Sequence, residues 1–258
     1  MVTLTPSVDR LAIPVVSTRP NRVEPLARRQ SIDMSLYTSH QRSAGLISGI
    51  FWQGVALYLR PQVTGAEHLP AQGAYILAAN HASHADSAVI YAAVPRALRS
   101  RLLAAAAQDY FFEGGLRQYM ARALFNAIPV DREGAQRRDP LRHVVRALRE
   151  GYGVLIYPEG TRSLTGKIGP FRSGIGRLIA QFPEVPVIPA LLEGTDEVMP
   201  KGRSVPLPRR VRVTFGAPLR LQADRAQRAS WQAAANRVRE AIVGLGQQEA
   251  PEEAEPEA

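Results

Sequence analysis

Residues 74–94 read AYILAANHASHADSAVIYAAV, and the order of patterns within this stretch decides the fold. The first six residues form an apolar run whose length and composition are typical of a buried strand. Residues 86–94 have the spacing of a helix, and a short polar segment joins the two. A buried strand followed at once by a helix is the repeating unit of a sheet that helices cover on both faces.

The alternation of strands and helices continues to residue 245. Further strands are expected at residues 101–106, 127–130, 154–157, 185–190 and 211–215, and further helices at residues 111–125, 139–150, 174–181 and 222–245. The strand at 211–215 alternates in the way that suits an edge strand with one exposed face. The last helix has an apolar stripe of Trp231, Ala235, Val238 and Ile242. We therefore predict a single α/β domain, residues 62–245, with a mixed, mostly parallel central sheet flanked by helices.

An apolar segment, residues 44–60, precedes this domain. It is shorter than the roughly 20 residues that a membrane-spanning helix needs, and it contains Gln53. Two interpretations stay open. Trp52 and Tyr58 at its edges fit an amphipathic helix that lies in a membrane interface, and the same spacing fits a helix that covers the protein's own core.

The two ends of the chain have the composition of disordered segments. Residues 1–43 are rich in proline, arginine and serine without a sustained period, so we expect a disordered leader. We hypothesise that the natural start is Met34, shortly before the apolar segment. Residues 246–258 are predicted to form a disordered acidic tail.

The charge is strongly positive and the chain has no cysteine. The formal net charge is +9, and residues 247–258 contain five glutamates and no cation, so the remainder carries 9 + 5 = +14. Anionic membranes and nucleic acid are the usual partners of such a surface, but charge alone does not choose between them. The absence of cysteine excludes disulfides, thiolate nucleophiles and cysteine-ligated metals. The apolar run at 11–16 is too short for a secretory signal.

The polar segment after the first strand carries a histidine and a carboxylate five positions apart, His81 and Asp86. Histidine is the usual base for taking a proton from an alcohol, and a carboxylate on its other nitrogen fixes the ring. If Ser83 caps the helix that follows, Asp86 lies in its first turn and can point back toward His81. The alternative is a capping pair beside an incidental histidine. A metal cluster with His84 is disfavoured because further ligands are lacking.

A second polar segment, YPEGTRS at residues 157–163, follows another apolar run. Gly160 permits a close approach of the backbone, and Arg162 is a planar fork that suits a phosphate. Glu159 can orient Arg162 or accept a hydrogen bond from a substrate. A surface turn with one salt bridge is the plain alternative. Because sites in open α/β sheets lie at the carboxyl ends of strands, we expect both segments at one sheet edge.

Three more cations are candidates for anion binding. Arg132 follows the strand expected at 127–130, in the same position relative to a strand as the two segments above. Lys167 and Arg172 flank a Gly-Pro-Phe sequence just before the helix expected at 174–181. Each of them is, taken alone, compatible with a solvated surface charge.

In these blocks the chain resembles the glycerolipid acyltransferase family that includes 1-acyl-glycerol-3-phosphate acyltransferases. Residues 80–86 match its N-H-x-S-x-x-D block and residues 157–163 match its F/Y-P-E-G-T-R-S block. Residues 128–132 and the VPVIP sequence at 185–189 match two weaker blocks, although Asn126 and Ala127 stand where a glycine is often found. The resemblance covers about residues 62–220.

The resemblance implies acyl transfer from acyl-CoA or acyl-carrier protein to the hydroxyl of a lysophospholipid, with no metal or redox cofactor. His81 would be the base and Asp86 its partner. The substrate-binding candidates that it implies are Ser83, Arg132, Glu159, Gly160, Thr161 and Arg162, with Lys167 and Arg172 as secondary ones.

The implied acceptor is lysophosphatidic acid, because two arginines would face a phosphate, and the implied role is in phospholipid biosynthesis. Other lysolipid or alcohol acceptors stay open. The expected partners are a membrane lipid and the acyl donor, without nucleic acid, and the expected location is the cytoplasmic face of the cell membrane. A hydrolase using Ser83, which lacks the G-x-S-x-G elbow, and a non-catalytic binder of nucleic acid or membrane are the two other classes.

Overall fold

The computed structural model describes residues 49–107, 124–130, 139–163, 165–199 and 206–248, all within one compact unit, Ser35–Ala258. The leader at 1–43, Met34, Arg132 and most of the helix expected at 111–125 lie outside these ranges. Most of the acidic tail also lies outside them.

The described residues build a seven-stranded sheet in the order β1-β7-β6-β2-β5-β3-β4. Its strands are β1 (Gln62–Thr64), β7 (Arg212–Phe215), β6 (Val187–Glu193), β2 (Tyr75–Ala79), β5 (Gly153–Ile156), β3 (Leu102–Ala107) and β4 (Ile128–Val130). Neighbouring strands are parallel except β6 and β7, which are antiparallel. The predicted α/β domain with a mixed, mostly parallel sheet is confirmed.

Strand β2 lies between β5 and β6, and all five of its residues are buried. Its last paired residues are Ala78 opposite Ile156 on β5 and Ala79 opposite Ala190 on β6. The three strands are parallel, so the segments that leave the carboxyl ends of β2 and β5 start side by side. This register brings the two polar segments of the sequence to one edge.

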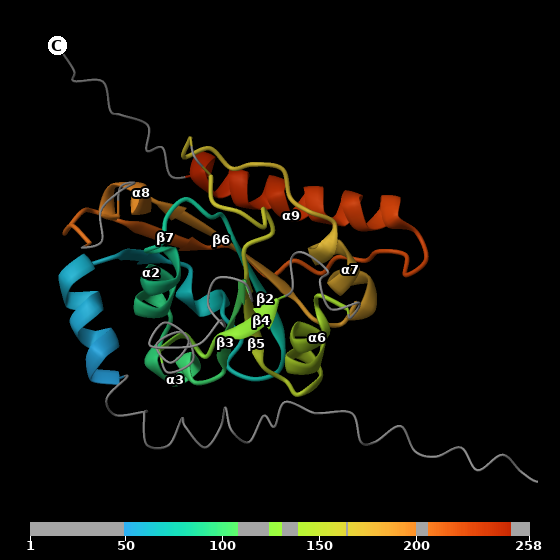
Figure 1. Ribbon diagram of the computed structural model, residues 1–258, viewed down its shortest axis with the longest axis horizontal. Helices are drawn as coiled ribbons and strands as arrows, with labels where there is room; N and C mark the ends of the chain where they lie inside the picture. Colours follow the sequence, from blue (N-terminus) through green and yellow to red (C-terminus); the bar gives the residue numbers. More distant parts are fainter. Residues whose placement is uncertain (1–48, 108–123, 131–138, 164, 200–205, 249–258) are drawn as a thin grey trace, which may run out of the picture. The chain divides into compact units, whose positions relative to one another are not determined.

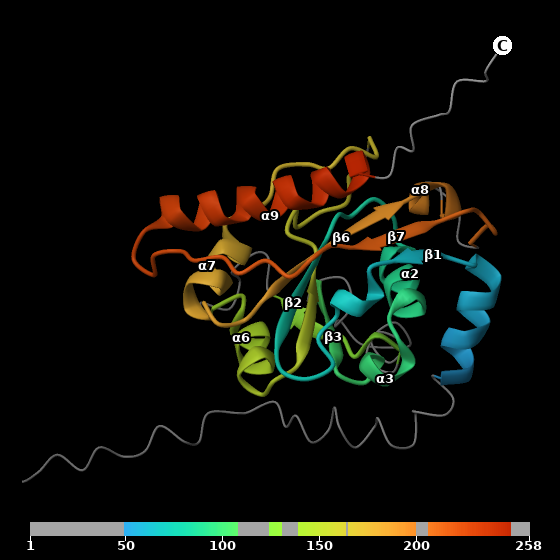
Figure 2. The same ribbon diagram turned by 180° about the vertical axis from the view of Figure 1, so that it is seen from behind.

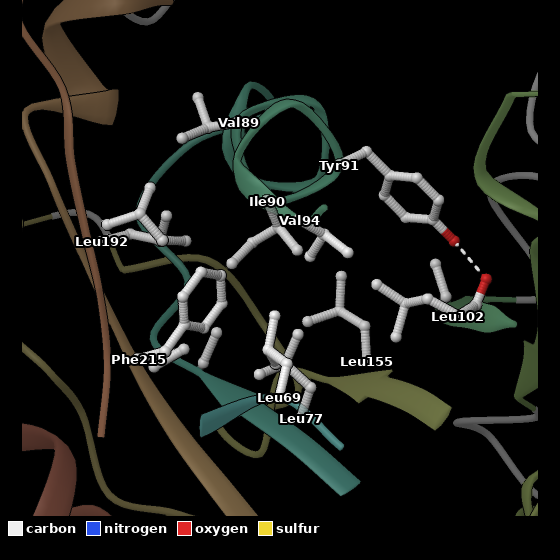
Figure 3. Packing of buried hydrophobic residues seen from close by; sticks show 14 of the residues in the cluster. Leu69, Leu77, Val89, Ile90, Tyr91, Val94, Leu102, Leu155, Leu192 and Phe215 are labelled. Atoms are coloured by element: carbon white, nitrogen blue, oxygen red, sulfur yellow. Dashed lines mark hydrogen bonds between the residues drawn. The ribbon is translucent and has the colours of Figure 1, made fainter. Parts of the chain in front are cut away.

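One face of the sheet is covered by α2 (Asp86–Ala93). Val89, Ile90 and Tyr91 of this helix pack on a buried cluster that includes Leu77 of β2 and Leu155 of β5, as Figure 3 shows. The Tyr91 hydroxyl donates to the carbonyl of Leu102 at 2.8 Å, which satisfies its polar group inside the core. Burial also raises the pKa of Tyr91 well above its usual value.

The opposite face is covered by α6 (Arg142–Arg149), α7 (Gly174–Gln181) and α9 (Arg228–Gln248), which can be followed in Figures 1 and 2. Helix α9 packs on both α7 and β6. Three residues of its predicted stripe, Ala235, Val238 and Ile242, are fully buried, whereas Trp231 is half-buried. Gly176 of α7 lies so close to α9 that a Cβ there would overlap the carbonyl oxygen of Trp231.

Replacing Gly176 with alanine is expected to destabilise the fold by about 1–3 kcal/mol, because backbone atoms of α9 must move to admit the methyl group. The matched control is Gly244→Ala in α9, where a Cβ would meet nothing within 4 Å. Alanine favours a helix by up to about 1 kcal/mol over glycine, so this control should hold or raise stability. Denaturant unfolding of both variants measures the difference, and equal stabilities would contradict the tight α7–α9 contact.

The prediction that residues 211–215 form an edge strand is wrong. Strand β7 is paired on both sides, with β6 and with β1. An edge strand with one wet face would expose both Arg212 and Thr214, which point to the same side of the strand. Arg212 is exposed, but Thr214 is buried. On this side of the described sheet the edge strand is β1. It was not predicted because its three exposed residues give no apolar pattern.

Helix α9 begins at Arg228, six residues after the predicted start at 222. Asp224 explains the difference, because its side chain accepts the Ala226 N–H at 2.8 Å and its own N–H donates to the Ser230 hydroxyl at 2.9 Å. Such local side-chain hydrogen bonds compete with helix formation. The short helices α3 (Arg96–Arg99), α8 (Thr195–Val198) and η1 (Ala66–His68) were not predicted.

The apolar segment before the domain is helical at residues 49–59. Trp52 is buried in the core and stacks on Tyr91 with a centroid distance of 5.3 Å, as the second of the two interpretations, a helix that covers the protein's own core, requires. The opposite side of the helix leaves large apolar side chains exposed, among them Ile50 and Leu57, the latter with 69% of its surface exposed. The helix therefore covers part of the core and still presents an apolar surface.

Within the described ranges, every helix is too short or too polar to cross a membrane.

Candidate active site

His81 and Asp86 meet at the carboxyl end of β2. His81 is the second residue after the strand, and Asp86 is the first residue of α2. The Nδ1 atom of His81 lies 2.7 Å from Oδ2 of Asp86. The carboxylate is fully buried, whereas 22% of the histidine side chain is exposed. The two residues thus form a buried acid that holds a histidine reaching the surface.

The same carboxylate oxygen organises the loop between them. Oδ2 of Asp86 also accepts the backbone N–H groups of Ala82 at 2.8 Å and Ser83 at 2.9 Å. These bonds place a negative charge at the start of α2, where the helix dipole favours it. The helix has Ala85 as its N-cap, so Ser83 does not occupy the capping position. Ser83 is buried, and its hydroxyl accepts the Ala85 N–H at 3.2 Å.

This geometry selects one tautomer of the neutral histidine ring. An ionised carboxylate can only accept hydrogen bonds, so Nδ1 of His81 carries the proton and Nε2 carries a lone pair. Within the described part of the chain, Nε2 has no hydrogen-bond partner. A neutral imidazole of this kind can take a proton from a hydroxyl group at the surface.

The backbone of His81 is held by the second polar segment. Its N–H donates to Oε1 of Glu159 at 2.9 Å, and its carbonyl accepts the N–H of Ser163 at 2.7 Å. Glu159 comes from the loop after β5, 78 residues further along the chain. The two segments that the sequence placed at one edge are therefore hydrogen bonded to each other, a connection that the sequence analysis did not predict.

Both carboxylate oxygens of Glu159 accept hydrogen bonds from backbone N–H groups of the protein. Besides the bond to His81, its Oε2 accepts the N–H of Gly169 at 3.0 Å, and only 7% of the residue is exposed. We had expected it to orient Arg162 or to contact a substrate. Its described contacts instead tie the loop after β2 to the loop that contains Lys167.

Tyr157 lies against the catalytic candidate. Its ring stacks on the His81 ring with a centroid distance of 4.2 Å and an interplanar angle of 17°. Its hydroxyl and that of Ser87 are 3.0 Å apart. Burial, together with the negative charge of Asp86, raises the pKa of Tyr157 well above its usual value. The ring thus remains neutral and limits the rotation of His81.

The predicted anion-binding residues lie in the loop after β5 and beyond it. Thr161, Arg162, Lys167 and Arg172 are exposed. Gly160 has φ +73°, and a Cβ there would approach Nε of Arg172 to 2.7 Å. That Nε donates to the carbonyl of Glu159 at 3.2 Å, so Arg172 packs against the turn that contains Gly160.

Arg162 and Arg132 are the two remaining arginines that the sequence proposed for anion binding. Burial and the nearby charges of Arg162 and His81 lower the pKa of His84, which places Arg162 near the first polar segment. Arg132 is outside the described residues. The strand before it, β4, ends at Val130 and is parallel to β3, which is in turn parallel to β5.

Asn80 is a residue whose role the sequence did not reveal. Its side-chain oxygen accepts the N–H of Leu192 at 2.8 Å and its side-chain nitrogen donates to the carbonyl of Leu192 at 2.9 Å. Both bonds reach β6. The amide imitates a further residue of β2 and lets the chain leave the sheet at the position of His81 without unpaired polar groups.

Comparison with known proteins places the chain in a family and supports the α/β fold. The family described as Acyltransferase matches residues 60–193, which is more than half of the 258 residues. The chain belongs to this family.

Relatives with assigned names point to one subgroup. The 1-acyl-sn-glycerol-3-phosphate acyltransferase BAT2 of Brassica napus, described as chloroplastic, is 27% identical over 177 residues, which cover 65% of this chain and 47% of the relative. The 1-acyl-sn-glycerol-3-phosphate acyltransferase alpha of Homo sapiens is 29% identical over 143 residues, which cover 52% of this chain and 46% of the relative. The chain spans about half the length of these relatives.

A solved structure has the same fold. The 1-acyl-sn-glycerophosphate acyltransferase PlsC from Thermotoga maritima superimposes with a TM-score of 0.60 at 22% identity. The superposition covers 83% of this chain and 82% of that one. At this level of identity the comparison supports the fold.

Proposed function

We propose that this protein transfers an acyl group from a thioester donor to the free hydroxyl of lysophosphatidic acid, forming phosphatidic acid. The observation that carries the proposal is the 2.7 Å hydrogen bond between Asp86 and Nδ1 of His81, which leaves the Nε2 lone pair toward the surface. Exposed cations follow in the loop after β5, and the names of the relatives specify the reaction and the acceptor class.

In the proposed mechanism, Nε2 of His81 removes the proton of the acceptor hydroxyl as its oxygen attacks the thioester carbonyl carbon. The new C–O bond forms and the C–S bond breaks. The leaving sulfur then takes the proton from the imidazolium, which returns His81 to its starting state. Asp86 stabilises the transient positive charge on the ring and keeps Nε2 directed at the hydroxyl. No covalent acyl-enzyme is required.

The phosphate of the acceptor is proposed to bind the exposed cations Arg162, Lys167 and Arg172, with Arg132 completing the set. Arginine suits this task because its planar fork donates two parallel hydrogen bonds to a phosphate. Thr161 and the Gly160 turn shape this pocket in the proposal, and Ser83 belongs to the same substrate-binding set. Glu159 contributes indirectly, since it holds the backbone of His81.

The donor is proposed to be acyl-CoA or acyl-carrier protein, with neither a metal nor a redox cofactor. We place the enzyme at the cytoplasmic face of the cell membrane as a peripheral protein, because the acceptor is a membrane lipid. The exposed apolar side of residues 49–59 and the positive net charge support this location.

The proposal is tested by lipid mass spectrometry on the purified chain in detergent. Lysophosphatidic acid is offered with a mixture of acyl-CoAs, and in parallel with acyl-carrier protein loaded with the same chains. We expect phosphatidic acid, and at least about 10-fold less product from monoacylglycerol, which lacks the phosphate but keeps the hydroxyls. Free fatty acid released at equal rates with and without an acceptor would overturn the proposal in favour of a hydrolase.

A further inference from the structure

A side chain on the last helix is bound to the loop that contains Lys167. Nε of Arg239 on α9 donates to the carbonyl of Gly169, and its Nη2 donates to the carbonyl of Ile168, both at 2.9 Å. Gln232, two turns earlier on α9, donates from Nε2 to the carbonyl of Phe171 at 3.0 Å. Helix α9 therefore holds this loop through three backbone carbonyls, those of Ile168, Gly169 and Phe171.

The bonds of Arg239 are stronger than ordinary surface contacts. Arg239 is half-buried, and a charged donor bound to a carbonyl stabilises by roughly twice as much as a neutral one. Its fork makes two bonds to adjacent residues, which fixes both the position and the direction of the backbone there. Arg237, on the same helix, is exposed and has no such contact among the described residues.

The loop connects Arg239 to the proposed catalytic base. The N–H of Gly169 donates to Oε2 of Glu159 at 3.0 Å, and Oε1 of Glu159 accepts the N–H of His81 at 2.9 Å. One short series of hydrogen bonds thus runs from α9 to the backbone of His81. The loop also supplies Lys167 and Arg172 from either side of the residues that Arg239 holds.

We propose that Arg239 is a positioning residue of the acceptor-binding site, acting through the loop at 165–172. It does not contact the reacting atoms. It fixes the backbone next to Lys167 and keeps the Gly169 N–H directed at Glu159. This inference rests on the proposed function for its kinetic consequences, and on the hydrogen bonds alone for its effect on the loop.

The expected kinetic effect falls mainly on acceptor binding. When Arg239 is lost, His81 is still held by Asp86, by Glu159 and by Ser163, so the chemical step retains its geometry. The loop, by contrast, loses two charge-assisted bonds next to Lys167. We expect Arg239→Ala to raise KM for lysophosphatidic acid about 10-fold, with kcat changed by no more than about 3-fold.

The experiment compares Arg239→Ala and Arg239→Lys with Arg237→Ala as the matched control. Lysine can replace one bond of the fork but not both, so its KM should lie between those of alanine and wild type. Arg237→Ala should match wild type. A second cycle combines Arg239→Ala with Lys167→Ala, and the KM effect of Arg239→Ala should shrink in the Lys167→Ala background.

A measurement without activity separates this inference from the proposed function. Hydrogen–deuterium exchange of the peptide that covers 165–172 should be at least about 10-fold faster in Arg239→Ala than in wild type or Arg237→Ala. If wild type shows no acyl transfer, the proposed function fails while faster exchange still supports the loop contact. Unchanged exchange, or a KM that does not move while the variant is folded, would overturn the positioning role.

Discussion

Replacing His81 with alanine is expected to lower kcat for phosphatidic acid formation by about 10³-fold or more, because the reaction loses its base. The backbone should stay in place, since its N–H and carbonyl are held by Glu159 and Ser163 whatever the side chain is. Asp86 keeps its bonds to the Ala82 and Ser83 N–H groups, so the folded structure should persist. Product formation by mass spectrometry and thermal unfolding measure the two parts of this prediction.

The matched control is His84→Ala, three residues away in the same segment. His84 is exposed and is not the histidine whose Nδ1 Asp86 holds at 2.7 Å, so its loss should change kcat by no more than about 3-fold. A His81→Ala variant that is folded and retains turnover within about 10-fold of wild type would show that another group is the base.

Removal of Asp86 should produce the second large loss, and two variants separate charge from geometry. Asp86→Ala leaves Nδ1 of His81 and the backbone N–H groups of half-buried Ala82 and buried Ser83 without their acceptor. We expect a kcat at least about 10³-fold lower and a stability loss of about 1–3 kcal/mol for each unpaired group. Activity assays and denaturant unfolding would be made on the same preparations.

Asp86→Asn retains the geometry, because all three hydrogen bonds converge on one oxygen, Oδ2. An asparagine oxygen in that position has two lone pairs for the three donors, and it can still accept from Nδ1 and select the same ring tautomer. What it cannot supply is the negative charge that stabilises the imidazolium. We expect kcat to fall about 10²-fold and stability to fall by about 1–3 kcal/mol, because the amide NH2 would take the place of Oδ1, which is buried and has no hydrogen-bond partner among the described residues. Wild-type activity in this variant would show that the charge has no role.

Local patterns in the sequence were sufficient for most elements of the fold. We predicted strand β2, the start of α2 and the whole of α7, because an apolar run or a helical spacing can be recognised within a few neighbouring residues. The order of the strands in the sheet could not be predicted from such local patterns. The place of β7 between β6 and β1 depends on a three-residue strand with no apolar residue facing the core.

In the candidate site, too, contacts between residues close in sequence could be predicted, whereas contacts between distant residues could not. His81 and Asp86 are five residues apart, so their contact could be predicted from spacing and then from family resemblance. The contacts that support them are distant in sequence: Asn80 binds Leu192 across 112 residues, and Arg239 binds Gly169 across 70. No local pattern marks such pairs, because each depends on which strands and helices become neighbours after folding.

The family match ends at residue 193, which is also the last residue of β6. Strand β7, which pairs with β6, and helix α9, which packs on it, both come from the chain beyond that point. A recombinant fragment cut at the family boundary would leave a seven-residue strand with unpaired hydrogen-bonding groups and an uncovered apolar face. Such an edge is a template for self-association, so we expect a fragment limited to the family match at residues 60–193 to aggregate.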